Sequence, residues 1–380
     1  MRAYKIEVNP TIEQEEQILK TMGVCRFLYN LYIQKQQEYY KENNKLLTAN
    51  EFDQWYRKEF ITDETSWITE VSSKARKQSI LDCEKAFKSF FKKQSNFPKF
   101  KKRGKNECSV YFCRESLNQI IKYNRHNIKL PLLGWIKFKE FGYLPKNKDI
   151  ISGRITKRAG RYFISLIVDE DITSKPVSYS HGIGIDFGVK DLAITSTNKV
   201  YKNINKTKKV KRLEKQLRHQ QRCLSRKHES NKKFKKGNHR NIQKQTLRVQ
   251  KVYLRLDFLR SNYENQAIND ILKNRPEYIA LEDLNVNGLL KNKYLSKSIS
   301  NQRFNSLKTK LINKSKECGI EVRIVNRYYP SSKICSKCGC IKQDLKLKDR
   351  TYICTNCGNT IDRDLNAAIN LANAKIYKVA

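Results

Sequence analysis

The chain has 380 residues, of which 39% are hydrophobic, so it is long enough for two or three domains that each bury a core. Its 78 lysines and arginines outnumber 37 acids, and the resulting formal net charge of +41 predicts a polyanionic partner. No run of about 18 apolar residues is available to span a bilayer, and residues 1–5 lack an apolar signal core. The composition therefore argues against a membrane or secreted protein and favours the cytoplasm.

The N-terminal pattern predicts a short strand followed by a long helix. Residues 2–8 alternate as a strand does and end at Asn9-Pro10. Thr11 is then a candidate N-cap, with Gln14 three residues later to complete a capping box. Helical periodicity continues through Tyr40.

Residues 72–93 give the clearest amphipathic helix. One side is apolar, and a separate arc carries four lysines and no acid. That arc is either an ordinary solvated face or a surface for nucleic acid, and both interpretations stay open. The apolar side comprises Ile80, Cys83, Phe87, Phe90 and Phe91, and the basic arc comprises Lys74, Gln78, Lys85, Lys88 and Lys92.

From Asn96 onward the pattern changes to short strands, which we expect to form a small β-barrel. The N-terminal strand can complete this barrel, with the helices between them as an insertion. Lysines alternate with aromatic residues on these strands, which suits contacts to a nucleic-acid backbone with base stacking, or else a wet face of the barrel. The candidate strands cover 109–112, 127–131, 135–138 and 160–168.

Residues 202–260 carry 21 lysines and arginines against three acids. Leu213, Leu217 and Leu224 keep rough helical spacing, which breaks at Gly237-Asn238. We expect a helical pair that forms one wall of a groove for phosphates.

Three acids stand where a metal-dependent nuclease needs them. Asp186 lies in an apolar strand flanked by glycines, Glu282 ends a second buried strand, and Asp364 opens a C-terminal helix near its positive end. A buried carboxylate is costly without a partner, so bridging divalent cations best explain three of them on one sheet. Asp283 should point to the opposite strand face. Asp362, which lies before the helix, should either support the helix or weakly assist the metal.

Four cysteines have the spacing of a zinc ribbon. Cys335-x2-Cys338 and Cys354-x2-Cys357 can close on one Zn²⁺ through four thiolates. Cys340 is out of register with these pairs, and the remaining cysteines are scattered singly, so we expect them to be ordinary thiols.

These motifs resemble the TnpB (OrfB) proteins of bacterial insertion sequences. The resemblance rests on residues 184–188, 280–284, 329–339 and 362–368, and more loosely on 9–11, 25–30 and 97–101. It implies a multidomain α/β protein: an RNase H-like (RuvC) nuclease domain with a zinc ribbon, and a small wedge-like β-barrel with an inserted helical recognition domain. The implied boundaries are 1–10 and 97–175 for the barrel, 11–96 for the recognition domain and 180–380 for the nuclease domain, with a basic helical segment at 202–275 and the zinc ribbon at 329–360.

The resemblance also implies an activity, namely that of an RNA-guided DNA endonuclease encoded by a transposon and dependent on Mg²⁺ or Mn²⁺. Its partners would be a guide RNA from its own element and target double-stranded DNA beside a short flanking motif. Such a protein belongs in the bacterial cytoplasm, on the nucleoid when bound to DNA.

The resemblance further assigns roles to individual residues. Asp186, Glu282 and Asp364 would be the catalytic metal ligands, and the four cysteines would bind Zn²⁺. Lys74 and Gln78 are our candidates for contacts to the flanking DNA motif.

Three other functions remain open. They are a nuclease-inactive RNA-guided repressor, a transposase that performs strand transfer, and a structure-specific nuclease without a guide.

Overall fold

The computed structural model describes the chain except for residues 105–107, 115–120, 171–180, 235–238 and 347–348. The described residues form two units, Met1–Asp171 and Ile172–Ala380, each with its own cores. The predicted helix break at Gly237 and the predicted boundary between residues 175 and 180 lie outside the described residues. None of the described helices combines the length and apolar content that crossing a membrane requires.

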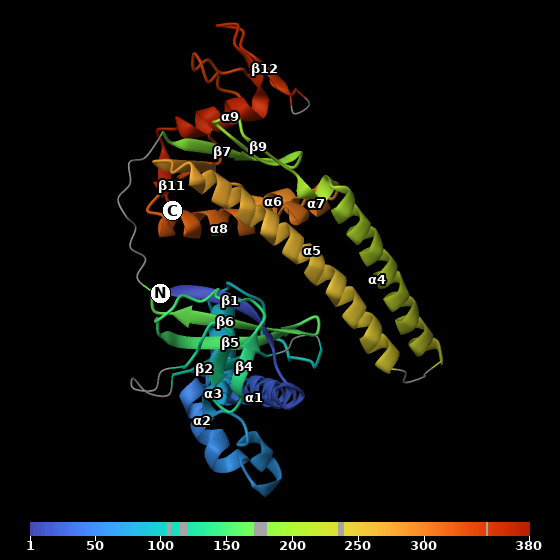
Figure 1. Ribbon diagram of the computed structural model, residues 1–380. Helices are drawn as coiled ribbons and strands as arrows, with labels where there is room; N and C mark the ends of the chain where they lie inside the picture. The colour runs from blue at the N-terminus through green and yellow to red at the C-terminus, as the bar shows by residue number, and fades with distance from the viewer. Residues whose placement is uncertain (105–107, 115–120, 171–180, 235–238, 347–348) are drawn as a thin grey trace. The chain divides into compact units, whose positions relative to one another are not determined.

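The first unit is built on one six-stranded antiparallel sheet in the order β2-β5-β6-β1-β4-β3 (Figure 1). The N-terminal strand β1 lies inside this sheet, between β6 and β4, although helices separate it from them in sequence. The strands are β1 (Arg2–Asn9), β2 (Val110–Cys113), β3 (Asn127–Leu130), β4 (Gly134–Phe138), β5 (Ile150–Arg158) and β6 (Arg161–Val168). The sequence pattern did not reveal β5.

Helices fill the interval between β1 and β2. They are α1 (Ile12–Asn43), α2 (Ala49–Trp55) and α3 (Ser73–Phe91), with a π-helical turn at Tyr56–Phe60 and a 3₁₀ turn at Asp63–Ile68. Thr11 caps α1 in the predicted capping box with Gln14. On α3, Ile80, Cys83 and Phe87 are buried. Phe91, the last residue of the helix, is 44% exposed, but its ring packs against those of Phe87 and Phe90 on the predicted apolar side.

The second unit is a six-stranded mixed sheet in the order β14-β11-β10-β7-β8-β9. The strands β7, β8 and β9 form an antiparallel meander, whereas β10 and β11 run parallel to β7. The strands are β7 (Ile183–Phe187), β8 (Asp191–Thr195), β9 (Val200–Lys202), β10 (Tyr278–Glu282), β11 (Glu321–Val325) and β14 (Tyr377–Val379). A separate hairpin pairs β12 (Thr351–Ile353) with β13 (Thr360–Asp362).

Two helix layers flank this second sheet. The main core packs α5 and α8 against the face that carries Ile183, Ile185 and Leu281, while α9 packs against the face that carries Gly184 and Ala280. The helices are α4 (Lys208–Phe234), α5 (His239–Lys273), α6 (Val286–Leu290), α7 (Ser296–Gln302), α8 (Phe304–Glu317) and α9 (Arg363–Ala372), with a 3₁₀ turn at Ile204–Lys206.

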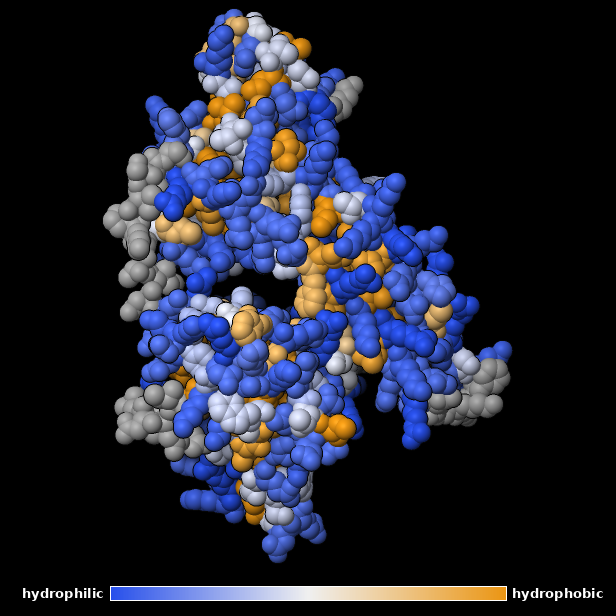
Figure 2. All heavy atoms as spheres, viewed as in Figure 1, coloured by the Kyte–Doolittle hydropathy of each residue, from blue (hydrophilic) through white to orange (hydrophobic). Residues whose placement is uncertain are grey.

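The basic segment forms a long helical pair, as the sequence predicted. Apolar side chains of α4 and α5 interlock along the pair, among them Leu213, Leu217 and Val252. Hydrophilic side chains predominate on the face drawn in Figure 2, including most of those on α4. Arg218, Arg222 and Arg226 recur every four residues on α4 and line a shallow hollow along it.

Candidate metal and nuclease centre

Two of the three predicted acids lie at the same level on neighbouring parallel strands. The strands β7 and β10 pair with Ile185 opposite Leu281, so Asp186 and Glu282 are the next residues toward the carboxyl ends. Because side chains alternate along a strand, both carboxylates leave the sheet on the face opposite to Ile185 and Leu281.

The third acid reaches this face on α9. Gly184, two residues before Asp186, lets the helix approach the strand closely, since a Cβ atom at this position would lie 1.9 Å from the carbonyl oxygen of Ala368 and 2.5 Å from the nitrogen of Ala372. Asp364 is in the first turn of the same helix. Chain segments almost 180 residues apart therefore contribute carboxylates to one face of the sheet.

The start of α9 is fixed by its cap. The Asp362 carboxylate accepts hydrogen bonds from the backbone N–H groups of Asp364 at 2.9 Å and Leu365 at 3.1 Å, which is the supporting role expected from the sequence. Arg363 donates to Asp364 Oδ1 from Nη2 at 2.9 Å, and Arg350 lies 3.6 Å from Oδ2. The Asp364 carboxylate is thus held by two arginines.

The pKa of Asp186 reflects the charges of the other two acids. Burial, followed by the negative charges of Asp364 and Glu282, raises the pKa of Asp186 to about 8, and Arg363 opposes this rise. Burial also raises the pKa of Glu282, with a contribution from Asp283. A buried acid that feels the negative charges of two other acids is a favourable environment for a cation.

Asp283 does not belong to this group. Its carboxylate forms ion pairs with Lys308 on α8 at 3.2 Å and with Arg327 at 2.8 Å. Hydrogen bonds from Arg327 and Lys308 hold its pKa below the usual value. The expectation that Asp283 turns away from Glu282 agrees with these partners.

The four cysteines of the predicted zinc ribbon converge. Their sulfur atoms all lie within 4.8 Å of one another, with Cys338 and Cys354 at 3.5 Å and Cys335 and Cys357 at 3.7 Å. A tetrahedral Zn²⁺ with bonds of about 2.3 Å places sulfurs about 3.8 Å apart, so these residues fit the metal. Among the described residues, this is the one group of three or more ligand side chains gathered tightly enough for a single ion, so Asp186, Glu282 and Asp364 are spaced more widely than the ligands of one ion.

Two matching turns build the zinc site. Gly339 donates from its N–H to the Cys335 carbonyl at 2.9 Å, and Gly358 donates to the Cys354 carbonyl at 3.1 Å. Both glycines have positive φ, 74° and 67°, which an L-residue adopts only with strain. Each Cys-x2-Cys pair is therefore followed by the residue that its turn needs.

Two buried asparagines that the sequence analysis missed join the ribbon to α9. Asn366 donates to the Ile334 carbonyl at 2.6 Å and accepts from the Ser336 N–H at 2.9 Å. Asn370 donates to the carbonyls of Ser331 and Ile334, both at 2.7 Å. Two asparagines four residues apart on an otherwise apolar helix were the available signal, since a buried amide needs partners. The ribbon is thereby anchored to the helix that carries Asp364.

Lys74 and Gln78 lie on α3 in the first unit, whereas the three acids belong to the second unit. Lys74 is exposed, whereas Gln78 is half-buried and donates to Asp82 at 2.9 Å. Asp82 in turn accepts two hydrogen bonds from the Arg154 guanidinium at 2.7 and 2.9 Å. Gln78 is held in a network with β5, and Lys74 extends into solvent one turn before it.

Comparison with protein families matches three stretches of the chain. Residues 1–45 match a helix-turn-helix domain of OrfB proteins of the IS605 type, residues 165–293 match the OrfB probable transposase model, and residues 304–371 match a Cas12f1-like TNB domain. Within residues 1–45 the structure has β1 and the single helix α1, so the name helix-turn-helix does not describe this segment.

Relatives resemble the chain along almost its whole length. A putative RNA-guided DNA endonuclease of Streptomyces pristinaespiralis is 29% identical over 381 residues, covering 98% of this chain and 89% of the relative. The putative RNA-guided DNA endonuclease InsQ of Escherichia coli K12 is 28% identical over 396 residues, covering 98% and 92%.

A solved structure shares the fold. The Cas12f1 chain in a complex with sgRNA and target DNA superposes with a TM-score of 0.61 at 15% identity, covering 96% of this chain and 84% of that one. The family models and the full-length relatives confirm the resemblance to the TnpB (OrfB) proteins of insertion sequences, and the matched stretches contain Asp186, Glu282 and Asp364.

Proposed function

We propose that this protein is an RNA-guided, metal-dependent DNA endonuclease of a transposon, which cuts target DNA beside a short flanking motif. The observation that supports the proposal is the placement of Asp186 and Glu282 at one level on the α9 face of the second sheet, where the charge of Asp364 also acts on Asp186. The full-length relatives named as RNA-guided DNA endonucleases support the reaction class and the guide.

The strand order supports a RuvC-type assignment. An antiparallel meander of β7, β8 and β9 continues into the parallel strands β10 and β11, and the acids lie at the carboxyl ends of β7 and β10. We assign the sheet of the first unit to the wedge-like barrel (1–10 and 97–175), the helices to the recognition domain (11–96), and 180–380 to the nuclease domain.

The donor set of the acids fits Mg²⁺ or Mn²⁺. All three side chains offer the hard oxygen ligands that these ions prefer, and their mutual repulsion is what a cation relieves. When bound there, the metal would supply an activated water and stabilise charge on the reacting phosphodiester.

The protein's own residues have distinct tasks in this proposal. Asp186 and Glu282 are held by rigid neighbouring strands, so their spacing is preset. Asp364 is positioned by the capped helix and by the arginines beside it, and in the proposed site these arginines also provide positive charge for a phosphate. Lys74 and Gln78 would contact the flanking motif, and the arginine row of α4 would follow a nucleic-acid backbone.

The test is cutting of a plasmid that carries a guide-matched target, by protein co-expressed with RNA from its own locus. Asp186→Asn should abolish cutting and leave RNA binding intact. Asp283→Asn is the matched control, because it removes a neighbouring carboxylate that faces Lys308 and Arg327 instead. Cutting that needs RNA, Mg²⁺ and Asp186 supports the proposal. RNA-dependent binding without cutting would indicate a repressor, and cutting without RNA would exclude the guide.

A further inference from the structure

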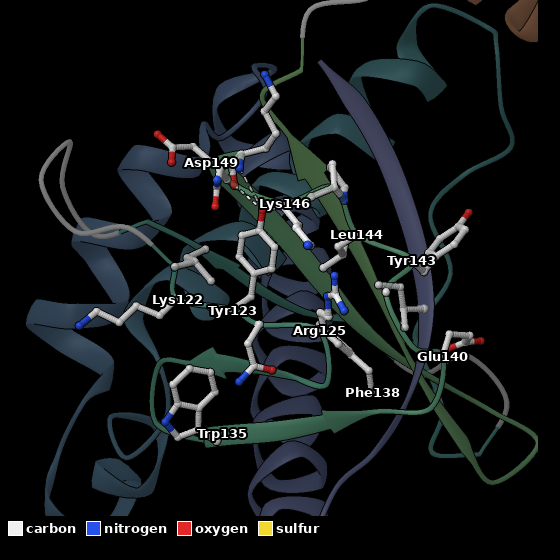
Figure 3. Close-up of a pocket in the computed structure, with 17 residues that line it drawn as sticks. Lys122, Tyr123, Arg125, Trp135, Phe138, Glu140, Tyr143, Leu144, Lys146 and Asp149 are labelled. Carbon is white, nitrogen blue, oxygen red and sulfur yellow. Dashed lines mark hydrogen bonds between the residues drawn. The ribbon is translucent and has the colours of Figure 1, made fainter.

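The first unit contains a groove that none of the functions above uses. Its cavity measures about 580 Å³, within the range of about 300–1,000 Å³ that is common for ligand sites. Four parts of the chain line it: Ile6 of β1, residues 121–125, the strand β4, and residues 140–149. Figure 3 shows Trp135 at one end of the groove, Tyr143 at the other, and Tyr123 between them.

The walls of the groove are fixed by hydrogen bonds. The Tyr123 hydroxyl lies 2.7 Å from the Pro145 carbonyl oxygen and 2.8 Å from that of Lys148, and accepts from the Lys148 N–H at 3.1 Å. The Gly142 N–H donates to the Arg125 carbonyl at 3.3 Å. These bonds join two irregular segments to each other, so the groove exists before any ligand enters.

The floor is apolar and the rim has exposed aromatic rings. Ile6, Ile121 and Phe138 are buried beneath it as part of the core of the first unit. Trp135 is 48% exposed and Tyr143 is 55% exposed. Planar rings open to solvent at both ends of an apolar floor offer stacking surfaces to another planar group.

The rim is also basic. Lys122, Arg125, Lys146 and Lys148 line the groove and are all exposed. Within the described parts of the chain, the three lysines form no ion pair. Two acids line it as well, and one of them, Glu140, already accepts a hydrogen bond from the Glu7 N–H at 2.9 Å. The groove therefore favours a ligand that combines a flat apolar group with negative charge.

We propose that this groove binds an unpaired nucleotide of the RNA partner, with its base stacked on Trp135 and its phosphates beside the lysines of the rim. The inference rests on the proposed function, since it names a contact of the same RNA. A structured RNA presents unstacked bases in loops and bulges, and aromatic side chains recognise such bases, whereas a paired base in an intact duplex has both faces covered.

The test reads out Trp135 by itself. The chain has three tryptophans, so the double variant Trp55→Phe/Trp67→Phe leaves Trp135 as the one indole, and Trp55→Phe/Trp135→Phe leaves Trp67 as a matched control. Each protein is titrated with a short oligouridylate, with its deoxyribose counterpart, and with an abasic oligoribonucleotide of equal length. Binding is followed in parallel by anisotropy of a labelled strand.

We expect the oligouridylate to quench Trp135 emission, the abasic strand to bind without quenching it, and Trp67 emission to stay unchanged. Trp135→Ala should weaken binding of the oligouridylate by at least about 5-fold, the lower end of what one stacked base contributes, and Trp135→Phe should restore most of the affinity. Because Trp135 is half exposed and lies on the rim of the groove, these variants should have the melting temperature of the wild type.

Unchanged Trp135 emission at saturating RNA would overturn the proposal, and so would quenching as strong by the deoxyribose strand as by the RNA. The plasmid assay separates this inference from the nuclease proposal. If the protein performs RNA-guided cutting but RNA leaves Trp135 emission unchanged, the groove proposal alone is overturned. If RNA quenches Trp135 emission but the protein does not cut, the groove proposal is supported and the nuclease proposal is overturned.

Discussion

Gly184 offers a sharp test of how Asp364 is positioned. In Gly184→Ala the new methyl group would lie 1.9 Å from the Ala368 carbonyl oxygen, whereas ordinary contacts begin at 3.4 Å. Because protein interiors are close-packed, α9 has to withdraw from β7 by roughly 1.5 Å. Asp364 lies one turn before Ala368 on α9, so it moves with the helix.

Two consequences follow from this shift. Overpacking of this kind costs about 1–3 kcal/mol of unfolding free energy, which lowers the melting temperature by several degrees. A displacement of about 1 Å in a catalytic group can reduce a rate about 100-fold. The guided cutting rate should therefore fall about 100-fold at temperatures where the variant is still folded.

The assay combines thermal unfolding with the guided plasmid assay at low temperature. Gly23→Ala is the matched control, because a Cβ atom there meets nothing closer than 4.0 Å and the residue lies within α1. Alanine in a helix gains about 0.5–1 kcal/mol over glycine, so the control should cut normally and melt no lower than the wild type. If Gly184→Ala cuts at the wild-type rate while folded, close packing of α9 on β7 does not position Asp364.

Three further variants test other parts of the structure. Asn370→Ala removes the hydrogen bonds to the Ser331 and Ile334 carbonyls. Because these carbonyls are then left without this partner, the unfolding free energy measured by denaturant titration should fall by about 1–3 kcal/mol. An unchanged midpoint would mean that Asn370 does not anchor the ribbon. Cys354→Ser should lower zinc content by elemental analysis from one ion per chain, together with the melting temperature, whereas full zinc retention would show that this sulfur is not a ligand. Gln78→Ala should cost about 0.5–1.5 kcal/mol of unfolding free energy through its bond to Asp82 and should impair cutting of targets with the flanking motif. Cutting of those targets at the wild-type rate would remove Gln78 from motif recognition.

Local patterns predicted much of the fold. The capping box at Thr11, the amphipathic α3 and the basic helical pair each depend on residues within a few positions of one another, and the structure has all three. The cysteine spacing likewise predicted a four-sulfur cluster, because each Cys-x2-Cys turn is local. The strands β5 and β11 were missed, because they are defined by their pairing with β6 and β10 and not by an alternation of apolar and polar residues of their own.

The sequence by itself determined the chemistry of this protein: which acids, thiols and cations are available, and in which local elements they stand. Only the tertiary structure decided that Asp186 and Glu282 share a level and a face, because strand register is a long-range property. The tertiary structure also revealed why residue 184 is glycine and why α9 carries buried asparagines. Gly184 leaves room for α9, and the asparagines form hydrogen bonds with the backbone of the ribbon, so both depend on contacts between residues distant in sequence. The groove beside Trp135 is of the same kind, because hydrogen bonds between separate loops build it and no local pattern describes it.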